Sequence, residues 1–258
     1  MRVENSIGDF RFHIQQFDSL ESTNKYCELL NLNEVEEFTV IVARSQTAGI
    51  GQRGNHWEAE PGKNLTFSIV LKPSFLPVAD QYQLTKAVSL GVTDWLAPLV
   101  PDGKSRVKIK WPNDIYVDDK KICGMLITNR VTGDRLSASI VGIGLNINQQ
   151  SFPDWVPNPT SLASLTGQEW PLEGMLTSLL SAIQSRYEAL RREPHGTLDT
   201  PYLARLLRRG EKSAFVLHGQ QIEATITGVN RFGHLQLVTP TGDQLSSQMK
   251  EIQFIPSL

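Results

Sequence analysis

Two hydrophobic periods run along this chain and predict different elements. Alternating or continuous apolar residues predict β-strands at residues 10–14, 38–43, 63–71 and 136–140. Apolar residues at helical spacing predict helices at 84–96, 172–190 and 202–207, with Asp80 as the cap of the first. A further helix is expected near residue 23, because Ser22 or Thr23 makes a good N-cap. The chain therefore mixes strands and helices up to about residue 209.

The stretch from 107 to 127 reads as strand, bend, strand, turn and strand. Pro112 ends the first strand, because proline lacks an amide donor, and alternation then resumes. Such a hairpin would bring a group of polar side chains to one end of a sheet: Lys110, Asn113, Asp114 and Lys121. Two ammonium groups and a carboxylate suit an anionic ligand such as a phosphate or a carboxylate. From the spacing alone, an ordinary hairpin with lysines at a solvated turn is the preferred interpretation.

The pattern changes after Gly210, where short strands follow one another at regular spacing. Strands are predicted at 214–217, 222–229, 235–238, 244–249 and 252–255, with glycines between or within them. We interpret residues 210–258 as a small β-barrel packed on a main domain of residues 1–209, because so small a domain has little core of its own. An SH3-like barrel of this size could also be a nucleic-acid or peptide module.

Composition narrows the class of protein. The 258 residues are 40% hydrophobic and 20% charged, with a formal net charge of −2, which gives no support to a broad nucleic-acid-binding surface. Cys27 and Cys123 lie far apart and lack metal-ligand spacing, so no metal site is predicted and a reducing compartment fits. No apolar run approaches the length of a membrane span, and we expect a soluble cytoplasmic protein. A basic cluster at 191–192, 205 and 208–209 is predicted to be a solvated helix face.

Two glycine-containing segments are candidates for ligand contact. Residues 44–57 contain three glycines within six positions, and such a loop can turn backbone N–H groups towards an anion. It lacks the G-K-[ST] ending of a P-loop, so a flexible surface loop stays open as an interpretation. Gly142 and Gly144 interrupt a strand, which indicates either close approach of a ligand or a simple bulge.

The block KWPNDIYVDDKKICG, residues 110–124, resembles the signature of biotin protein ligases, also called biotin–[acetyl-CoA carboxylase] ligases. Three companion motifs of the family stand in the family's order along the chain. They are E-S-T-N at 21–24 and Q-x-A-G-x-G-x-R-G-x-x-W at 46–57, both before the block, and G-x-G-x-N at 142–146 after it. The resemblance implies an α+β fold, in which a catalytic domain of mixed β-sheet packed with helices is followed by a small C-terminal SH3-like β-barrel. The missing N-terminal DNA-binding domain implies the monofunctional type, with no specific DNA binding.

The resemblance also implies the site residues. Those expected to bind biotin are Ser22, Thr23, Asn24, Gln46, Gly49, Gly51, Lys121, Gly124, Gly142 and Gly144. Those expected to bind ATP or the adenylate are Arg53, Trp57, Lys110, Asn113, Lys121 and Asn146. Lys121, Asp114 and Arg53 are the expected catalytic residues.

The implied chemistry has two steps. The biotin carboxylate attacks the α-phosphorus of ATP, which is expected to arrive with Mg²⁺, and forms biotinyl-5′-AMP. A lysine of a biotin carboxyl carrier protein, the biotinyl domain of a carboxylase, then takes the acyl group. Lys121 would neutralise the two anions as they meet, and Asp114 would orient and deprotonate the acceptor lysine. No membrane partner is implied, and the sequence leaves the oligomeric state, including a homodimer, open.

This chain departs from the family pattern in the glycine loop. Ile50 and Gln52 stand where the family commonly has arginine, and neither offers the charge-assisted contact that arginine makes with phosphate. Two alternatives therefore stay open. The chain could be a lipoate ligase, which shares the two-step logic but lacks the KWPND block, or a module that binds biotin without turning it over.

Overall fold

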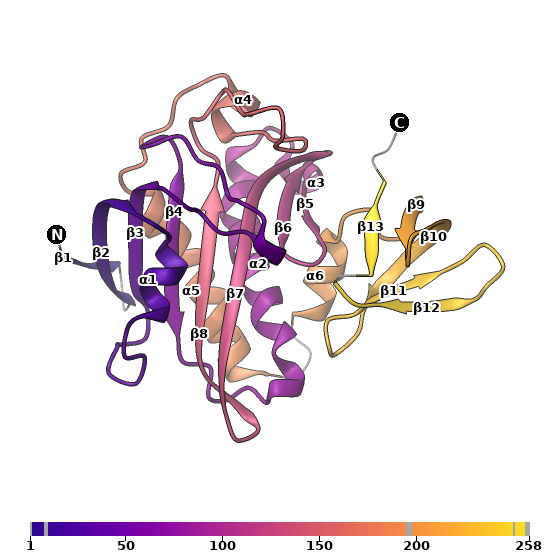
Figure 1. Cartoon of the computed structure of the whole chain (residues 1–258), viewed down its shortest axis with the longest axis horizontal. Coiled ribbons are helices and arrows are strands. Elements are labelled where there is room, and N and C mark those ends of the chain that lie inside the picture. The colour runs from indigo at the N-terminus through magenta and orange to yellow at the C-terminus, as the bar shows by residue number, and fades with distance from the viewer. Residues whose placement is uncertain (1, 8–9, 195–197, 250, 256–258) are drawn as a thin grey trace.

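The computed structural model describes residues 2–7, 10–194, 198–249 and 251–255, and the side chains of these residues except those of 2–11 and Arg53. Two β-sheets and six α-helices make up the described part of the chain (Figure 1). The larger sheet is mixed and carries the long helices, and the smaller one follows at the C-terminal end. The predicted fold class, α+β with a C-terminal β-domain, is confirmed.

The large sheet has eight strands in the order β1-β2-β3-β4-β8-β7-β6-β5. β2 and β3 pair in parallel, and every other neighbouring pair is antiparallel. The predicted hairpin 107–127 forms its β5-β6-β7 edge. The strands are β1 Arg2–Ile7, β2 Phe10–Leu20, β3 Thr39–Gln46, β4 Leu65–Leu71, β5 Val107–Lys110, β6 Asp114–Val117, β7 Lys120–Thr132 and β8 Arg135–Leu145.

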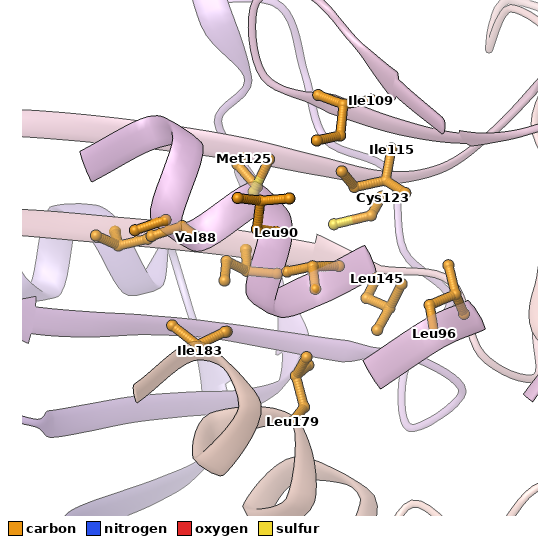
Figure 2. Close-up of a cluster of buried hydrophobic side chains, with 14 of the residues drawn as sticks. Val88, Leu90, Leu96, Ile109, Ile115, Cys123, Met125, Leu145, Leu179 and Ile183 are labelled. Carbon is orange, nitrogen blue, oxygen red and sulfur yellow. The ribbon is translucent and has the colours of Figure 1, made fainter. Parts of the chain in front are cut away.

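Helices cover the two faces of this sheet unequally (Figure 1). α2 and α5 pack together on one face and enclose the main core, where apolar side chains of both helices meet those of the sheet (Figure 2). α1 lies on the other face, against β3, β4 and β8. The helices are α1 Thr23–Glu28, α2 Tyr82–Leu96, α3 Gly103–Arg106, α4 Leu162–Thr166, α5 Met175–Arg192 and α6 Asp199–Arg205. No helix in these ranges is both long and apolar enough to cross a membrane.

Strand periodicity decides which residues face α1. On β8, Val141 and Ile143 join the main core, so the alternate residues Gly142 and Gly144 point to the opposite face. On β4, Phe67 joins the same core, and Thr66 and Ser68 therefore share the α1 face with those glycines. One side of the sheet is thus covered by the main core, and the other carries these small and polar residues beside a smaller apolar cluster under α1.

The smaller sheet is antiparallel, in the order β12-β11-β10-β9-β13, and fits an SH3-like fold. Within the described residues, no pairing of β12 with β13 closes it into a barrel. Its strands are β9 Lys212–Leu217, β10 Gln220–Val229, β11 Leu235–Val238, β12 Gln244–Ser247 and β13 Ile252–Phe254.

The turn between β10 and β11 docks on the large domain. Trp111 Nε1 donates to Gly233 O over 3.0 Å, and Arg231 forms two hydrogen bonds with the buried Asp80 carboxylate. The prediction that Asp80 caps α2 is therefore wrong: Gln81 occupies the N-cap position, and no side chain caps the helix. A tertiary ion pair, which the local sequence does not reveal, has taken the carboxylate.

The predicted solvated face of arginines is also wrong for three of its members. Arg191 pairs with Glu37, Arg205 pairs with Asp94, and Arg208, whose side chain is 10% exposed, donates to Ile255 O over 2.7 Å. These contacts tie α5 and α6 to other elements. The arginines therefore serve packing between elements rather than solvation of one helix.

Candidate active site

A cavity of about 350 Å³ lies on the α1 face of the large sheet. Its lining comes from the start of α1, the glycine loop, the central hairpin, β8 and the C-terminal sheet. The predicted site residues that line it are Ser22, Thr23, Asn24, Gln46, Gly51, Trp57, Lys110, Asn113, Asp114, Lys121, Gly124, Gly142 and Gly144. Segments that lie far apart in the sequence therefore converge on one site.

One end of the cavity consists of neutral polar groups. Ser22, Thr23 and Asn24 are all buried, and Ser22 occupies the N-cap of α1 without making a capping hydrogen bond. Thr23 N donates to Gln46 Oε1 over 2.8 Å, and Asn24 Nδ2 donates to Leu126 O over 3.3 Å. We call Thr23, Asn24, Gln46 and Ser68 the neutral end.

Ser68 is a member that sequence reasoning missed. It is fully buried on β4, and its Oγ lies 2.7 Å from Thr23 Oγ1 and 2.5 Å from Asn24 Oδ1. Ser68 lies behind Thr23 and Asn24, whereas Thr66, two residues earlier, lines the cavity itself. Polar residues at alternate positions of an otherwise apolar strand were the signal that could have revealed both.

Glycines on β7 and β8 make room for two of the lining side chains. A Cβ placed on Gly142 would lie 2.1 Å from Asn24 Oδ1, and one on Gly144 would lie 2.2 Å from the Trp57 indole. Gly124 pairs with Gly144 and would also meet the Trp57 ring. Any larger residue would force these side chains out of place, which favours close approach over a simple bulge.

The opposite end carries the charges. Lys121 Nζ lies 2.8 Å from Asp114 Oδ1 and 5.6 Å from the centre of the Trp57 ring, and both charged side chains are mostly buried. The pairing of β6 with β7 shifts register between Ile115 and Tyr116, so Tyr116 lies opposite Lys121 instead of Ile122. That bulge puts Lys121 on the face of Asp114. We call Lys110, Asp114, Lys121 and Trp57 the charged end.

Lys110 lies beside this pair in a less polar setting. Its Nζ donates to Tyr116 Oη over 3.2 Å and lies about 5 Å from the ring centres of Tyr116 and Phe254. Burial lowers the pKa of Lys110, and the nearby Asp114 carboxylate opposes that shift. Burial also raises the pKa of Tyr116, which therefore stays a neutral hydroxyl. A phosphate near this ammonium would restore its preference for the charged form.

The glycine loop folds back over the cavity. Trp57 N donates to Gly49 O over 2.9 Å, and Gly51 N donates to Asn55 O over 2.6 Å. Ile50 and Gln52 both line the cavity, and Gln52 reaches Met249 of the C-terminal sheet. The Trp57 indole N–H is buried and has no hydrogen-bond partner among the described residues.

Two predicted site residues with described side chains, Gly49 and Asn146, are not among those that line the cavity. Gly49 is buried within the glycine loop, where a Cβ would lie 2.5 Å from Trp57 O. Asn146 is buried and donates to Thr160 O over 3.0 Å. The backbone of Arg53 belongs to the short 3-10 helix Gln52–Gly54, and its side chain lies outside the described residues.

In the described ranges, His, Cys, Asp and Glu side chains nowhere gather in a group of three or more that could hold a metal ion. At the charged end, Asp114 offers carboxylate oxygens, and the amide Nδ2 of the adjacent Asn113 donates to Met125 O. In proteins, Mg²⁺ is usually bound by one or two carboxylates together with the phosphates of the substrate, and the Asp114 carboxylate fits that pattern.

This arrangement defines the class of protein. The chain belongs to the biotin/lipoate A/B protein ligase family, whose model matches residues 16–146. The bifunctional ligase/repressor BirA of Bacillus subtilis is 33% identical over 178 residues, covering 68% of this chain and 54% of that protein. The biotin–[acetyl-CoA-carboxylase] ligase of Paracoccus denitrificans is 29% identical over 209 residues, covering 80% and 86%. The chain thus spans about half the length of the BirA protein it matches.

Solved structures agree with the fold. The biotin protein ligase of Aquifex aeolicus in complex with biotin and ATP aligns with a TM-score of 0.77 and 26% identity, covering 95% of this chain and 99% of that one. The ligase of Leishmania major in complex with biotin aligns with a TM-score of 0.60 at 21% identity, which bears on the fold alone.

Proposed function

We propose that this chain is an ATP-dependent biotin protein ligase, which makes biotinyl-5′-AMP and transfers the biotinyl group to a lysine of a carrier domain. The observation that carries the proposal is that the neutral end and the charged end belong to one cavity. The neutral end offers several hydrogen-bonding groups without charge, as the ureido ring of biotin requires. The charged end offers Lys121 for its carboxylate.

In the first step, a biotin carboxylate oxygen attacks the α-phosphorus, and pyrophosphate leaves. Lys121 neutralises the two anions as they approach, and Lys110 and the Trp57 indole lie beside the same space for the nucleotide. Arg53 and Asn146 are further proposed nucleotide ligands. Asp114 would help to hold the Mg²⁺ that accompanies ATP, and the ion would supply charge shielding for the leaving pyrophosphate.

In the second step, the amine of an acceptor lysine attacks the acyl carbon, and AMP leaves. Asp114 lies next to Lys121 and is the carboxylate that can orient the amine and accept its proton. The proposed reaction needs no covalent enzyme intermediate, because the two nucleophiles, the biotin carboxylate and the acceptor lysine amine, both belong to substrates. Ser22, Gly51, Gly124, Gly142 and Gly144 complete the proposed biotin pocket, with Gly49 behind it.

The partner we propose is a biotin carboxyl carrier protein, the biotinyl domain of a carboxylase. Cys27 and Cys123 are free and buried, which suits a reducing compartment such as the cytoplasm. With a formal net charge of −2, we expect no membrane or sequence-specific DNA partner. We place the domain boundary between residues 209 and 210, just before β9 begins.

Lipoate is the second candidate substrate, because the family includes ligases for both acids. ATP–pyrophosphate exchange, run with biotin and with lipoate, separates the candidates. We expect exchange that depends on biotin and not on lipoate, followed by labelling of a biotinyl domain. Exchange with lipoate alone would assign the chain to the other substrate. Binding of biotin without exchange would leave only a binding module.

A further inference from the structure

We infer that Ser68 is a positioning residue that fixes the hydrogen-bond polarity of the neutral end, and so selects a cyclic urea over a ring in which a donor replaces the urea oxygen. The inference rests on the proposed function and adds a residue to its specificity. Ser68 does not line the cavity; it lies behind Thr23 and Asn24, fully buried on β4. It acts through those two side chains.

The argument begins at Asn24. Leu126 O accepts from Asn24 Nδ2 over 3.3 Å, and a carbonyl can only accept, so the amide nitrogen faces Leu126. Asn24 Oδ1 therefore faces Ser68 Oγ at 2.5 Å. An amide oxygen can only accept as well, and Ser68 must donate its proton to it.

Ser68 has one proton and two close neighbours. Its Oγ is also placed to donate to Thr23 Oγ1, 2.7 Å away, but one hydroxyl proton cannot serve both oxygens. The Thr23 hydroxyl, unlike Asn24 Oδ1, can donate. Both contacts are satisfied together when Ser68 donates to Asn24 and accepts from Thr23, which leaves lone pairs on Thr23 Oγ1 for a ligand N–H.

The remaining groups are fixed by the backbone. Gln46 Oε1 accepts from Thr23 N over 2.8 Å, so Gln46 Nε2 is left as a donor. The second proton of Asn24 Nδ2 has no partner among the described residues and is a donor as well. Thr23, Asn24 and Gln46 all line the cavity. They present two amide donors and one hydroxyl acceptor, which complements a carbonyl oxygen flanked by N–H groups.

Close packing keeps this arrangement in place. Ser68 pairs directly with Gly142 across β4 and β8, and the Asn24 amide lies so close to Gly142 that a Cβ there would overlap Oδ1. Without the Ser68 hydroxyl, a single 3.3 Å hydrogen bond would hold the Asn24 amide, and the Thr23 hydroxyl could rotate to donate. The site would then accept both polarities.

The test measures dissociation constants of biotin and of 2-iminobiotin, which carries a protonated imine in place of the urea oxygen at neutral pH. For Ser68→Ala we expect biotin to bind about tenfold more weakly, as the loss of one buried hydrogen bond implies. Binding of 2-iminobiotin should not weaken, so the ratio of the two constants should fall about tenfold. A lesion that merely loosened the fold would weaken both ligands alike.

Ser139→Ala is the matched control. Ser139 is equally buried, lies on β8 of the same sheet, and loses a single hydrogen bond to Asn129 outside the cavity. It should leave the ratio unchanged. Ser68→Cys keeps the size of the side chain and a weak S–H donor, so it should give a ratio between those of the wild type and Ser68→Ala. If Ser68→Ala does not fold, the ratio of Ser68→Cys tests the role of Ser68 instead. Absence of biotin binding by the wild type would refute the proposed function. Wild-type binding with an unaltered ratio in Ser68→Ala and Ser68→Cys would overturn the role of Ser68 alone.

Discussion

The two ends of the cavity are built in different ways. At the neutral end, every side chain rests on α1 or a central strand of the large sheet, and Ser68, Gln46 and Leu126 O tie Thr23 and Asn24 to their neighbours. At the charged end, Lys121 and Asp114 contact mainly each other, and the walls come from a loop and from the C-terminal sheet. A fixed polar frame suits recognition of one ring. Charges on a hairpin near a domain junction suit chemistry on anions.

The difference between the two ends shows where the C-terminal sheet contributes to the site. Ile252 and Phe254 of β13 line the cavity, and the Phe254 ring centre lies 5.3 Å from Lys110 Nζ at the charged end. The turn at Gly233 accepts a hydrogen bond from Trp111, two residues before Asn113. The neutral end has no such contribution among its hydrogen bonds. Loss of contact between the two domains should therefore affect nucleotide chemistry more than biotin recognition.

The largest expected effect on the rate of exchange comes from removing a charge at the charged end. Lys121→Ala should slow biotin-dependent ATP–pyrophosphate exchange by about 10²–10³-fold, because it removes the cation at the meeting of two anions. Lys120→Ala is the matched control, since Lys120 is the adjacent lysine and is exposed. Near-normal exchange by a folded Lys121→Ala protein would mean that the chemistry takes place elsewhere.

The next effect concerns the glycines. Gly144→Ala should displace the Trp57 ring from its place beside Lys121 and lower exchange about 100-fold, as a misplacement of about 1 Å can do. At Gly228, a Cβ meets only a Leu203 methyl at 3.5 Å, so Gly228→Ala should keep its activity. If both variants kept full activity, the close approach of Trp57 would have no role in the reaction.

Ile50 offers a way to strengthen the charged end. Ile50→Arg should add a charge-assisted contact to the adenylate phosphate, worth about 1.5–3 kcal/mol, and slow its release about 10- to 100-fold. Stopped-flow release of preformed biotinyl-5′-AMP, or labelling of bystander lysines, measures this. Ile50→Leu controls for the change of side chain. Equal release from all three proteins would show that position 50 does not hold the phosphate.

The smallest effect tests the junction between the domains. Trp111→Phe removes the hydrogen bond to Gly233 O and should lower the free energy of unfolding by about 1 kcal/mol and exchange several-fold. Trp95 also donates one indole hydrogen bond, to Ser178, far along α2 from the cavity. Because that hydrogen bond is exposed, urea unfolding should show a smaller loss of stability for Trp95→Phe, without loss of exchange. An equal loss of activity in both would remove any special role for the Gly233 turn.

Local pattern was enough to predict the hairpin, because Pro112 and the alternation around it depend on neighbours in sequence. The bulge that aligns Lys121 with Asp114 was not predictable, because it depends on pairing between strands. Asp80 was assigned to a helix cap, since its partner Arg231 is distant in sequence. The sequence does not single out Ser68, because its hydrogen-bonding partners Thr23 and Asn24 lie on α1, more than 40 residues away along the chain.

The central claim is that biotin lies with its ring at the neutral end and its carboxylate at the charged end. A crystal structure of this chain with biotin tests it most directly. We predict that the ureido oxygen accepts a hydrogen bond from Asn24 Nδ2, that a ureido N–H donates to Thr23 Oγ1, and that the carboxylate contacts Lys121 Nζ. A biotin bound in the reverse direction, or one that contacts neither Thr23 nor Asn24, would contradict the account.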